Sequence, residues 1–149
     1  MIVKFIAYSK IFEVKIRMNP LNTLESFMGH IFQGEMDNAL KLVADDAVFV
    51  SANPQVNPSN KMHGTFIGQD GATQFFGGFV EIIEPGEFTI EEKFSDGIHV
   101  AMYGTLKHTV RSTGKQFASN WALMSKIKNG KLTLYHFYED SEALARAML

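Results

Sequence analysis

The sequence of 149 residues contains no cysteine. This absence excludes disulfide bonds, thiolate zinc sites and a cysteine nucleophile. It also lacks any run of about 18 apolar residues, which a membrane-spanning helix requires, so we expect no membrane partner. Neither charge dominates, because 14 Lys and Arg stand against 16 Asp and Glu, for a formal net charge of -2. Nucleic-acid binding usually needs a basic field, so we expect no nucleic-acid partner.

Recognisable cofactor motifs are also missing. The chain has no P-loop, no dinucleotide-binding glycine fingerprint and no nucleophile elbow. Five histidines are present, but none stands in the HxH or HExxH spacing of metal ligands. We therefore expect neither a metal nor another cofactor, and the cytoplasm is the default compartment.

What the chain does have is apolar and aromatic side chains. Hydrophobic residues make up 46% and aromatic residues 12%, with 13 Phe against 1 Trp. This composition predicts a core rich in rings, some of which line a cavity. The length is typical of one domain, which we place at residues 18–149. Residues 1–17 are interpreted as an N-terminal extension, either an extra edge strand with a period of two or sequence that precedes the original start at Met18.

Helical periodicity occupies the first half of the domain. It predicts a first helix over 24–33, a second helix that ends at Val43, and a third that begins near Asp70. Asn22, followed three residues later by Glu25, resembles a capping box at the start of the first helix. The third helix carries an apolar stripe of Phe75, Phe76, Phe79, Ile82 and Ile83.

From Glu87 onward, after the helix-ending pair Pro85-Gly86, the period changes to two. Four strands are predicted over 87–94, 98–110, 115–127 and 131–139. Asn129-Gly130 between the last two is the strongest hairpin signal, because both residues tolerate the positive φ of a type I′ turn. A short helix over 141–149 follows the last strand. Helices followed by an antiparallel meander predict an α+β domain whose helices cover one face of the sheet.

Four segments of the domain carry a resemblance to a known family. They are "GEMDNALKLVADDAVF", "HGTFIGQDGATQFF", "TGKQFASNWALMSKIKNGKL" and "YHFYED". Over about residues 21–144 the chain is similar to the SnoaL-like polyketide cyclase and ketosteroid isomerase group of the nuclear-transport-factor-two-like superfamily. The resemblance implies a cystatin-like cone: a strongly curved antiparallel sheet wrapped around three N-terminal helices, with an apolar pocket at its mouth and often a dimer through the outer sheet face. Because the family's activities range from isomerisation and cyclisation to dehydration, the fold alone selects none.

The catalytic residues of the ketosteroid isomerases are absent from the matching positions. The resemblance places Phe27 where those enzymes have a Tyr, Ser51 where they have the carboxylate base, and Leu123 where they have a protonated Asp. Phe27 and Leu123 carry no hydrogen-bond donor, and Ser51 cannot act as a base without a neighbour that takes its proton. Steroid isomerisation by that mechanism is therefore excluded, and the three residues remain expected members of the pocket wall.

The end of the last strand holds the candidate carboxylates. In the polyketide cyclases a His or aromatic residue often precedes a late Asp by four residues, and His136 and Asp140 have that spacing. This resemblance implies Asp140 as a proton acceptor, and Glu139 is the competing candidate. The isomerase-like register turns Tyr135, Phe137 and Glu139 toward the pocket, whereas the cyclase-like register turns the opposite set inward. A solvated strand end, or the N-cap of the last short helix, is the structural alternative for both carboxylates.

Other side chains complete the expected site. His108 lies among aliphatic residues on its strand, where it either exchanges a proton with a ligand or is only hydrogen-bonded within the wall. Trp121 either stacks on a planar ligand or packs in the core. The further pocket candidates are His63, Phe75, Ser119, Tyr135 and Phe137.

Two functions are consistent with these features. The first is a SnoaL-like protein that binds a small, largely apolar molecule in the cone, with or without cofactor-independent proton transfer of the cyclase, isomerase or dehydratase type. The second is a non-catalytic binding or dimerisation module. In that case Leu132, Leu134 and Tyr138 are expected on the outer face, in the interface of a homodimer.

Overall fold

A computed structural model describes residues 19–149, so the predicted extension at 1–17 lies outside the described residues. These residues form an α+β domain with one six-stranded sheet, in the order β2-β1-β6-β5-β4-β3. The elements in chain order are α2 (Pro20–Phe32), α3 (Met36–Leu40), β1 (Val43–Ser51), β2 (Thr65–Ile67), α4 (Gly68–Ile82), β3 (Ile83–Asp96), β4 (His99–Val110), β5 (Gln116–Lys128), β6 (Lys131–Glu139) and α5 (Ser141–Met148).

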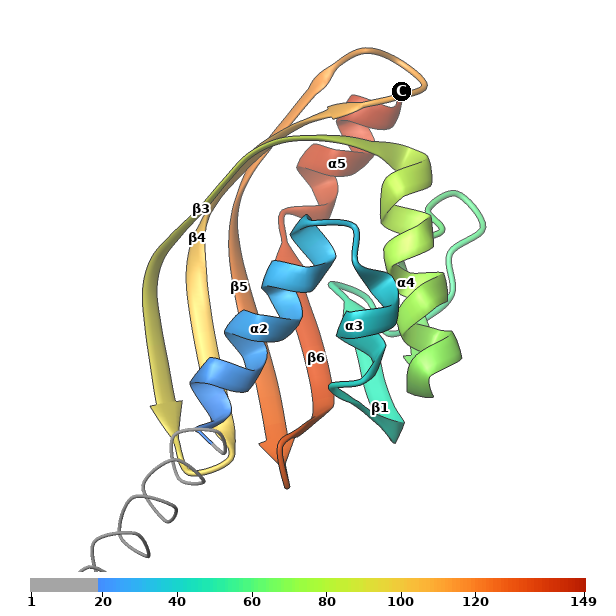
Figure 1. The fold of residues 1–149 in the computed structure, drawn as a ribbon. Coiled ribbons are helices and arrows are strands. Elements are labelled where there is room, and N and C mark those ends of the chain that lie inside the picture. Colours follow the sequence, from blue (N-terminus) through green and yellow to red (C-terminus); the bar gives the residue numbers. More distant parts are fainter. Residues whose placement is uncertain (1–18) are drawn as a thin grey trace, which may run out of the picture.

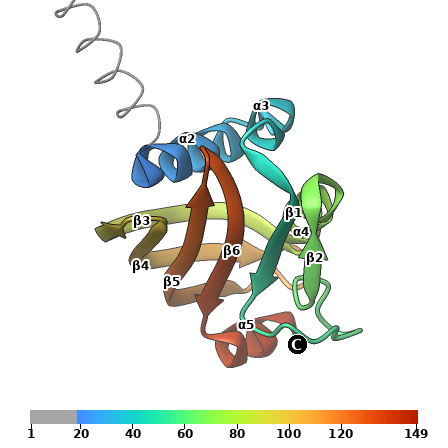
Figure 2. The same ribbon diagram turned by 90° about the horizontal axis from the view of Figure 1, so that it is seen from below.

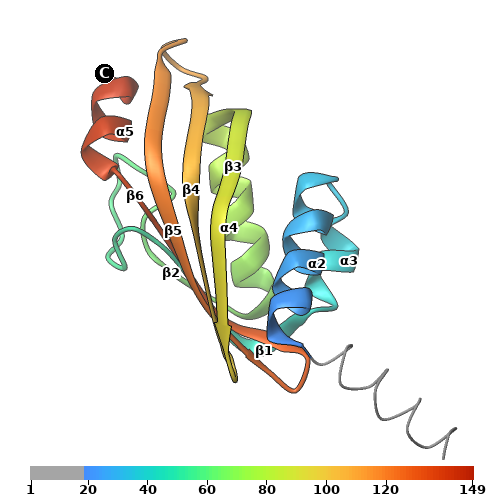
Figure 3. The ribbon, with the colours of Figure 1, turned by 90° about the vertical axis from the view of Figure 1, so that its left-hand side faces the viewer.

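The sheet is strongly curved, and the helices α2, α3 and α4 cover its inner face (Figure 1). Figure 2 shows the strands fanning from β3 to β2, and Figure 3 shows α2, α3 and α4 on one side of the sheet. Strands β3 to β6 form the predicted antiparallel meander. β1 adds to β6 in parallel, and β2 pairs antiparallel with β1. The curvature wraps the sheet around α2, as expected for the cone.

The first helix begins earlier than the sequence pattern predicted. Asn19, not Asn22, is its N-cap, and the Asn19 side chain accepts a hydrogen bond from the backbone N–H of Leu21 at 3.0 Å. Pro20 then occupies the first turn, where its missing N–H costs nothing. The predicted capping box at Asn22 and Glu25 was therefore wrong.

The second helix is shorter than predicted, and the chain becomes extended sooner. α3 ends at Leu40, and β1 begins at Val43, where the prediction still placed a helix. Val43 is buried and stands opposite Leu132 of β6. Pairing with a distant strand therefore decides the conformation of a segment that local periodicity assigned to a helix.

The third helix gives way directly to a strand. α4 ends at Ile82 and β3 starts at Ile83, so Pro85-Gly86 lies inside β3 and does not end the helix as predicted. The register with β4 shifts between Glu84 and Glu87. β3 is an edge strand, so a proline at this irregularity removes no ladder bond that the sheet needs.

The turn between β5 and β6 follows the prediction. Asn129 and Gly130 have φ values of 51° and 71°, the left-handed pair that a type I′ turn requires. The two strands then pair antiparallel from Lys128 and Lys131 onward.

The concave face of the sheet holds the core, and register fixes which residues reach it. Met102, Leu123 and Phe137 stand side by side on β4, β5 and β6. Leu132 is fully buried, which corrects its predicted place on the outer face. Gly104 stands opposite Trp121, and a Cβ at Gly104 would lie 1.9 Å from the Thr89 carbonyl oxygen, so only glycine lets the strands approach here.

Candidate functional site

A cavity of about 520 Å³ lies between the helices and the concave face of the sheet. This volume is within the range of about 300–1,000 Å³ that is typical of small-molecule sites. Most of its wall is apolar. The side chains that line it come from α2, α4, the strands and the loop before β2, and include Phe27, Met28, Ile31, Ser51, Met62, Phe75, Phe76, Phe79, Phe88, Leu106, His108, Tyr135 and Phe137.

Tyr135 lies at the centre of the aromatic part of the wall. Its ring is 5.6 Å from that of Phe49 and 5.8 Å from that of Phe27, between centroids, and it also contacts Phe75 and Phe76 from α4. Burial raises the pKa of the Tyr135 phenol. The phenol therefore stays neutral at physiological pH.

His108 is a buried titratable group that faces the cavity. Its Nδ1 accepts a hydrogen bond from the backbone N–H of Gly86 at 2.9 Å. Because Nδ1 accepts, the proton of the neutral ring is on Nε2. Burial lowers the pKa of His108, and the carbonyl of Lys107 opposes this effect. His108 is thus a neutral ring with a single N–H to donate.

Ser51 and Glu139 form the second polar part of the site. Ser51 ends β1 and pairs in register with Phe137, and Glu139 follows two residues later on the same face of β6. Burial raises the pKa of Glu139 to about 7. The Ser51 hydroxyl is close enough to offset part of the rise, but Ser51 Oγ and Glu139 Oε1 are both buried without a hydrogen-bond partner among residues 19–149.

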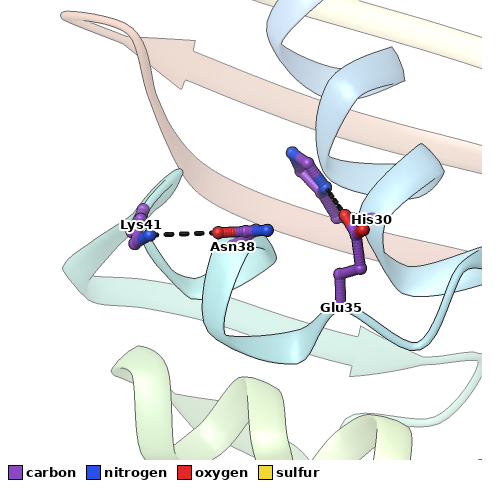
Figure 4. A network of polar contacts seen from close by, with 4 residues as sticks. All are labelled: His30, Glu35, Asn38 and Lys41. Atoms are coloured by element: carbon purple, nitrogen blue, oxygen red, sulfur yellow. Dashed lines mark hydrogen bonds and ion pairs between the residues drawn. The ribbon is translucent and has the colours of Figure 1, made fainter.

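The mouth of the cavity lies between the α2–α3 corner and α4. Phe32 and Val80 both line the cavity and are 62% and 56% exposed. The corner is held by a hydrogen bond of 2.6 Å in which His30 Nδ1 donates to the Glu35 carboxylate (Figure 4). At the end of α3, the Lys41 ammonium donates a second hydrogen bond to the Asn38 side-chain oxygen at 3.0 Å. The His30 ring and Asn38 lower the pKa of the exposed Glu35.

Six of the residues that we singled out from the sequence line this cavity. They are Phe27, Ser51, Phe75, His108, Tyr135 and Phe137. Glu139 does not itself line it, but lies behind Ser51. The isomerase-like register is therefore the one the strand adopts: His136 and Tyr138 face the other side of the sheet, where the Tyr138 hydroxyl and His136 Nδ1 lie 2.9 Å apart.

Asp140 is not brought to the cavity. It is exposed, and its side chain accepts a hydrogen bond from the backbone N–H of Ala143 at 2.9 Å as the N-cap of α5. Asp140 is therefore a helix cap, which was the structural alternative to its expected role as a proton acceptor. A short polar side chain before a helix satisfies an otherwise unpaired backbone N–H.

Trp121 and Leu123 belong to the core and do not line the cavity. The rings of Phe88 and Phe137 stack on Trp121, with centroids 4.5 Å and 5.5 Å away, and so separate it from the cavity. The indole N–H is already bonded to the carbonyls of Thr89 and Thr105. Leu123 is fully buried.

Ser119 and His63 are also displaced from the predicted pocket. The Ser119 hydroxyl accepts from the backbone N–H of Asp140 at 2.9 Å, at the junction of β6 and α5. His63 is buried in the loop before β2, where Nε2 contacts the side chain of Asn60 at 3.2 Å, and burial lowers its pKa. Its neighbour Met62 lines the cavity instead.

Several wall residues had no signal that distinguished them from core. Met28, Ile31 and Phe88 are apolar residues of ordinary helix or strand periodicity, and only the packing of α2 against the curved sheet leaves space beside them. Phe76 and Phe79 were recognised as a helical stripe but not as pocket. Within residues 19–149, His, Asp and Glu side chains form no group that could hold a metal ion, and no helix is long and apolar enough to span a membrane.

Comparison with known proteins places this fold and cavity in a family. The SnoaL-like domain family matches residues 24–135, and the chain belongs to that family. The comparison with curated proteins gives no match.

Solved structures share the fold at low identity. An NTF2-like protein from Burkholderia xenovorans LB400 aligns with a TM-score of 0.77 and 22% identity, over 87% of this chain and 95% of that chain. A protein named as a SnoaL-like polyketide cyclase from Mesorhizobium loti aligns with a TM-score of 0.63 and 22% identity, over 81% and 99%. A protein of ketosteroid isomerase-like fold from Catenulispora acidiphila, in complex with trimethylamine, aligns with a TM-score of 0.68 and 14% identity, over 85% and 91%.

Proposed function

We propose that this protein binds a small, largely apolar molecule in the cavity and catalyses a cofactor-independent proton transfer on it, of the cyclase, isomerase or dehydratase type. The observation that carries the proposal is an apolar cavity of about 520 Å³ with one titratable group, His108, in its wall and a second, Glu139, next to the wall residue Ser51. The low-identity neighbours, one of them named as a polyketide cyclase and another a complex with a small molecule, are consistent with it.

The two groups suit opposite halves of a proton transfer. Glu139, with a pKa of about 7, is balanced between acid and base at neutral pH, which is the condition under which a general base works best. Neutral His108 donates from Nε2 to an oxygen on which negative charge develops. Strand spacing and rise place their Cα atoms roughly 16 Å apart along the sheet, so they act on different parts of a ligand.

Binding is tested by native mass spectrometry of protein purified from cells, with two matched glycine variants. Gly77 of α4 lines the cavity and Gly29 of α2 does not, and each has open space around an added Cβ. We expect a co-purifying small molecule in the wild type and in Gly29→Leu, and its loss in Gly77→Leu. A molecule that remains bound to Gly77→Leu at the wild-type level would contradict binding in the cavity.

Catalysis is tested on the molecule that is identified in this way. Glu139→Gln and His108→Gln are each expected to lower its turnover by about 10²–10⁴-fold, the usual contribution of a general acid or base. Asp140→Asn is the control, because asparagine caps a helix as well as aspartate does. Turnover that survives Glu139→Gln would remove the carboxylate from the mechanism.

The second candidate function is a non-catalytic binding or dimerisation module. It is favoured by apolar side chains on the outer face of the sheet, where Tyr103, Ala122 and Tyr138 stand side by side on three strands. Phe94 and Met124 lie in the adjacent row on the same face and are 58% and 45% exposed. A second copy of the chain would cover this face in a homodimer.

A further inference from the structure

Two buried oxygens, one in the cavity wall and one next to it, have no hydrogen-bond partner among the described residues. Ser51 is 1% exposed and lines the cavity, and its Oγ is unpaired, as is Oε1 of Glu139. An unsatisfied buried polar group costs about 1–3 kcal/mol, so folded proteins rarely keep one without a role. Two unpaired oxygens near each other, next to a cavity, indicate that a ligand supplies their hydrogen-bond partner.

The surrounding side chains do not supply that partner. Trp121 stands opposite Glu139 on β5, but its N–H is bonded to the carbonyls of Thr89 and Thr105. Asp140 caps α5, and His136 faces the other side of the sheet. Burial and the Ser51 hydroxyl are the causes that shift the pKa of Glu139, so Ser51 is the one polar side chain in the described part of the chain that acts on this carboxyl.

We propose that Ser51, backed by Glu139, is the polar end of the binding site and accepts a hydrogen bond from a hydroxyl or protonated amine of the ligand. This inference rests on the proposed function and specifies its ligand class. An ionised carboxylate only accepts hydrogen bonds, so after a small rotation the Ser51 hydroxyl donates to Glu139. The lone pairs of Ser51 Oγ then face the cavity and take a donor.

The opposite wall has the reverse polarity. His108, three strands away in the sheet, accepts at Nδ1 from Gly86 and so has only a donor left. A ligand with a donor at one end, an apolar body and an acceptor at the other therefore matches both walls. The rings of Phe76, Phe79 and Phe88 line the cavity along that body.

The test compares naphthyl probes that differ only in the polar group. The intrinsic fluorescence of 2-naphthol, 2-(aminomethyl)naphthalene, 2-methoxynaphthalene and naphthalene reports their binding at pH 8, where most of Glu139 is ionised. A hydrogen bond to a charge-assisted acceptor is expected to give the two donor probes about tenfold higher affinity than the two probes without a donor. A gain seen with both donors assigns the hydroxyl class, and a gain seen with the amine alone assigns the ammonium class.

Variants locate the preference. Ser51→Ala and Glu139→Gln are each expected to abolish it, and Thr73→Ala, at a lining residue whose hydroxyl bonds the Gln69 carbonyl of its own helix, should keep it. Melting curves confirm that each variant is folded. Equal affinity for all four probes, or a donor preference that survives Ser51→Ala, overturns the inference and leaves the proposed function standing. Failure of every probe to bind overturns both.

Discussion

Glu139 shows how much a single residue depends on its neighbours. Its carboxyl is buried at the end of β6, near Ser51. Within residues 19–149, no basic side chain is among the groups that shift its pKa. Asp140, the next residue, has an exposed carboxylate that caps a helix. Two adjacent acids of similar chemistry thus differ in environment, and burial suits Glu139 to exchange a proton near neutral pH.

Burial of Glu139 predicts a pH-dependent stability. In the folded state the pKa of Glu139 is about 7, whereas the ordinary pKa of a glutamate side chain is 4.5. The stabilisation is therefore complete below pH 4.5 and is lost as the pH rises through about 7. At ~1.4 kcal/mol for each pKa unit, the contribution to the free energy of unfolding is on the order of 3 kcal/mol.

Urea unfolding of the wild type and Glu139→Gln at pH 5 and pH 8 measures this contribution. Burial lowers the pKa of His63, His108 and His136, which gives stability the opposite dependence on pH near pH 6. The informative quantity is therefore the difference between the two proteins, which should shift in favour of Glu139→Gln at pH 8. The same difference at both pH values would show that Glu139 titrates normally.

At the scale of elements, pairing partners decide the ends of helices and strands. β1 lies in parallel against β6, although the two are separated by most of the domain in sequence. The parallel pair brings Ser51 beside Phe137 and so builds part of the cavity wall. α2 is positioned from its start, where Asn19 and Pro20 fix the first turn.

The N-cap of α2 gives a prediction for this element. Asn19→Ala removes the acceptor for the Leu21 N–H and is expected to lower the free energy of unfolding by about 1 kcal/mol. Asn19→Ser is the matched control, because serine also caps and should stay within a few tenths of a kcal/mol of the wild type. Equal stability of the alanine and serine variants in urea unfolding would show that the cap contributes nothing.

For the whole molecule, the curved sheet separates two apolar surfaces. The inner face is filled by the core and the cavity, and the outer face carries Phe94, Tyr103, Met124 and Tyr138, which are 41–58% exposed. The rings of Phe94 and Tyr103 stack at a centroid distance of 6.4 Å. Such a row of exposed large side chains is typical of an interface.

The outer face predicts the oligomeric state. Light scattering is expected to give the mass of a dimer at micromolar concentration for the wild type and that of a monomer for the double variant Tyr103→Glu/Met124→Glu, because buried charges oppose association. Val56→Glu is the control, at an apolar residue that is 81% exposed in the loop before β2. A wild-type protein that is monomeric at this concentration would disprove the interface.

Sequence patterns predicted the local parts of this structure well. The four strands of the meander and the Asn129-Gly130 turn follow from a period of two and a turn signal, both of which act over a few residues. The patterns failed where partners are distant. The continuation of the second helix to Val43 was wrong because that segment pairs with β6 as a strand. Leu132 was misplaced because the register between β5 and β6 shifts between Lys126 and Ile127, which turns Leu132 into the core.

For the site, the apolar and aromatic character of the wall is set by the amino-acid sequence alone, as is the presence of His108, Ser51 and Glu139 on strands. Which rings face open space is decided only by tertiary structure, since sheet curvature leaves Phe88 and Phe137 on the cavity and Trp121 behind them. The difference between Glu139 and Asp140 is likewise tertiary. Burial depends on what the rest of the chain places around a side chain, and neighbours in sequence do not fix it.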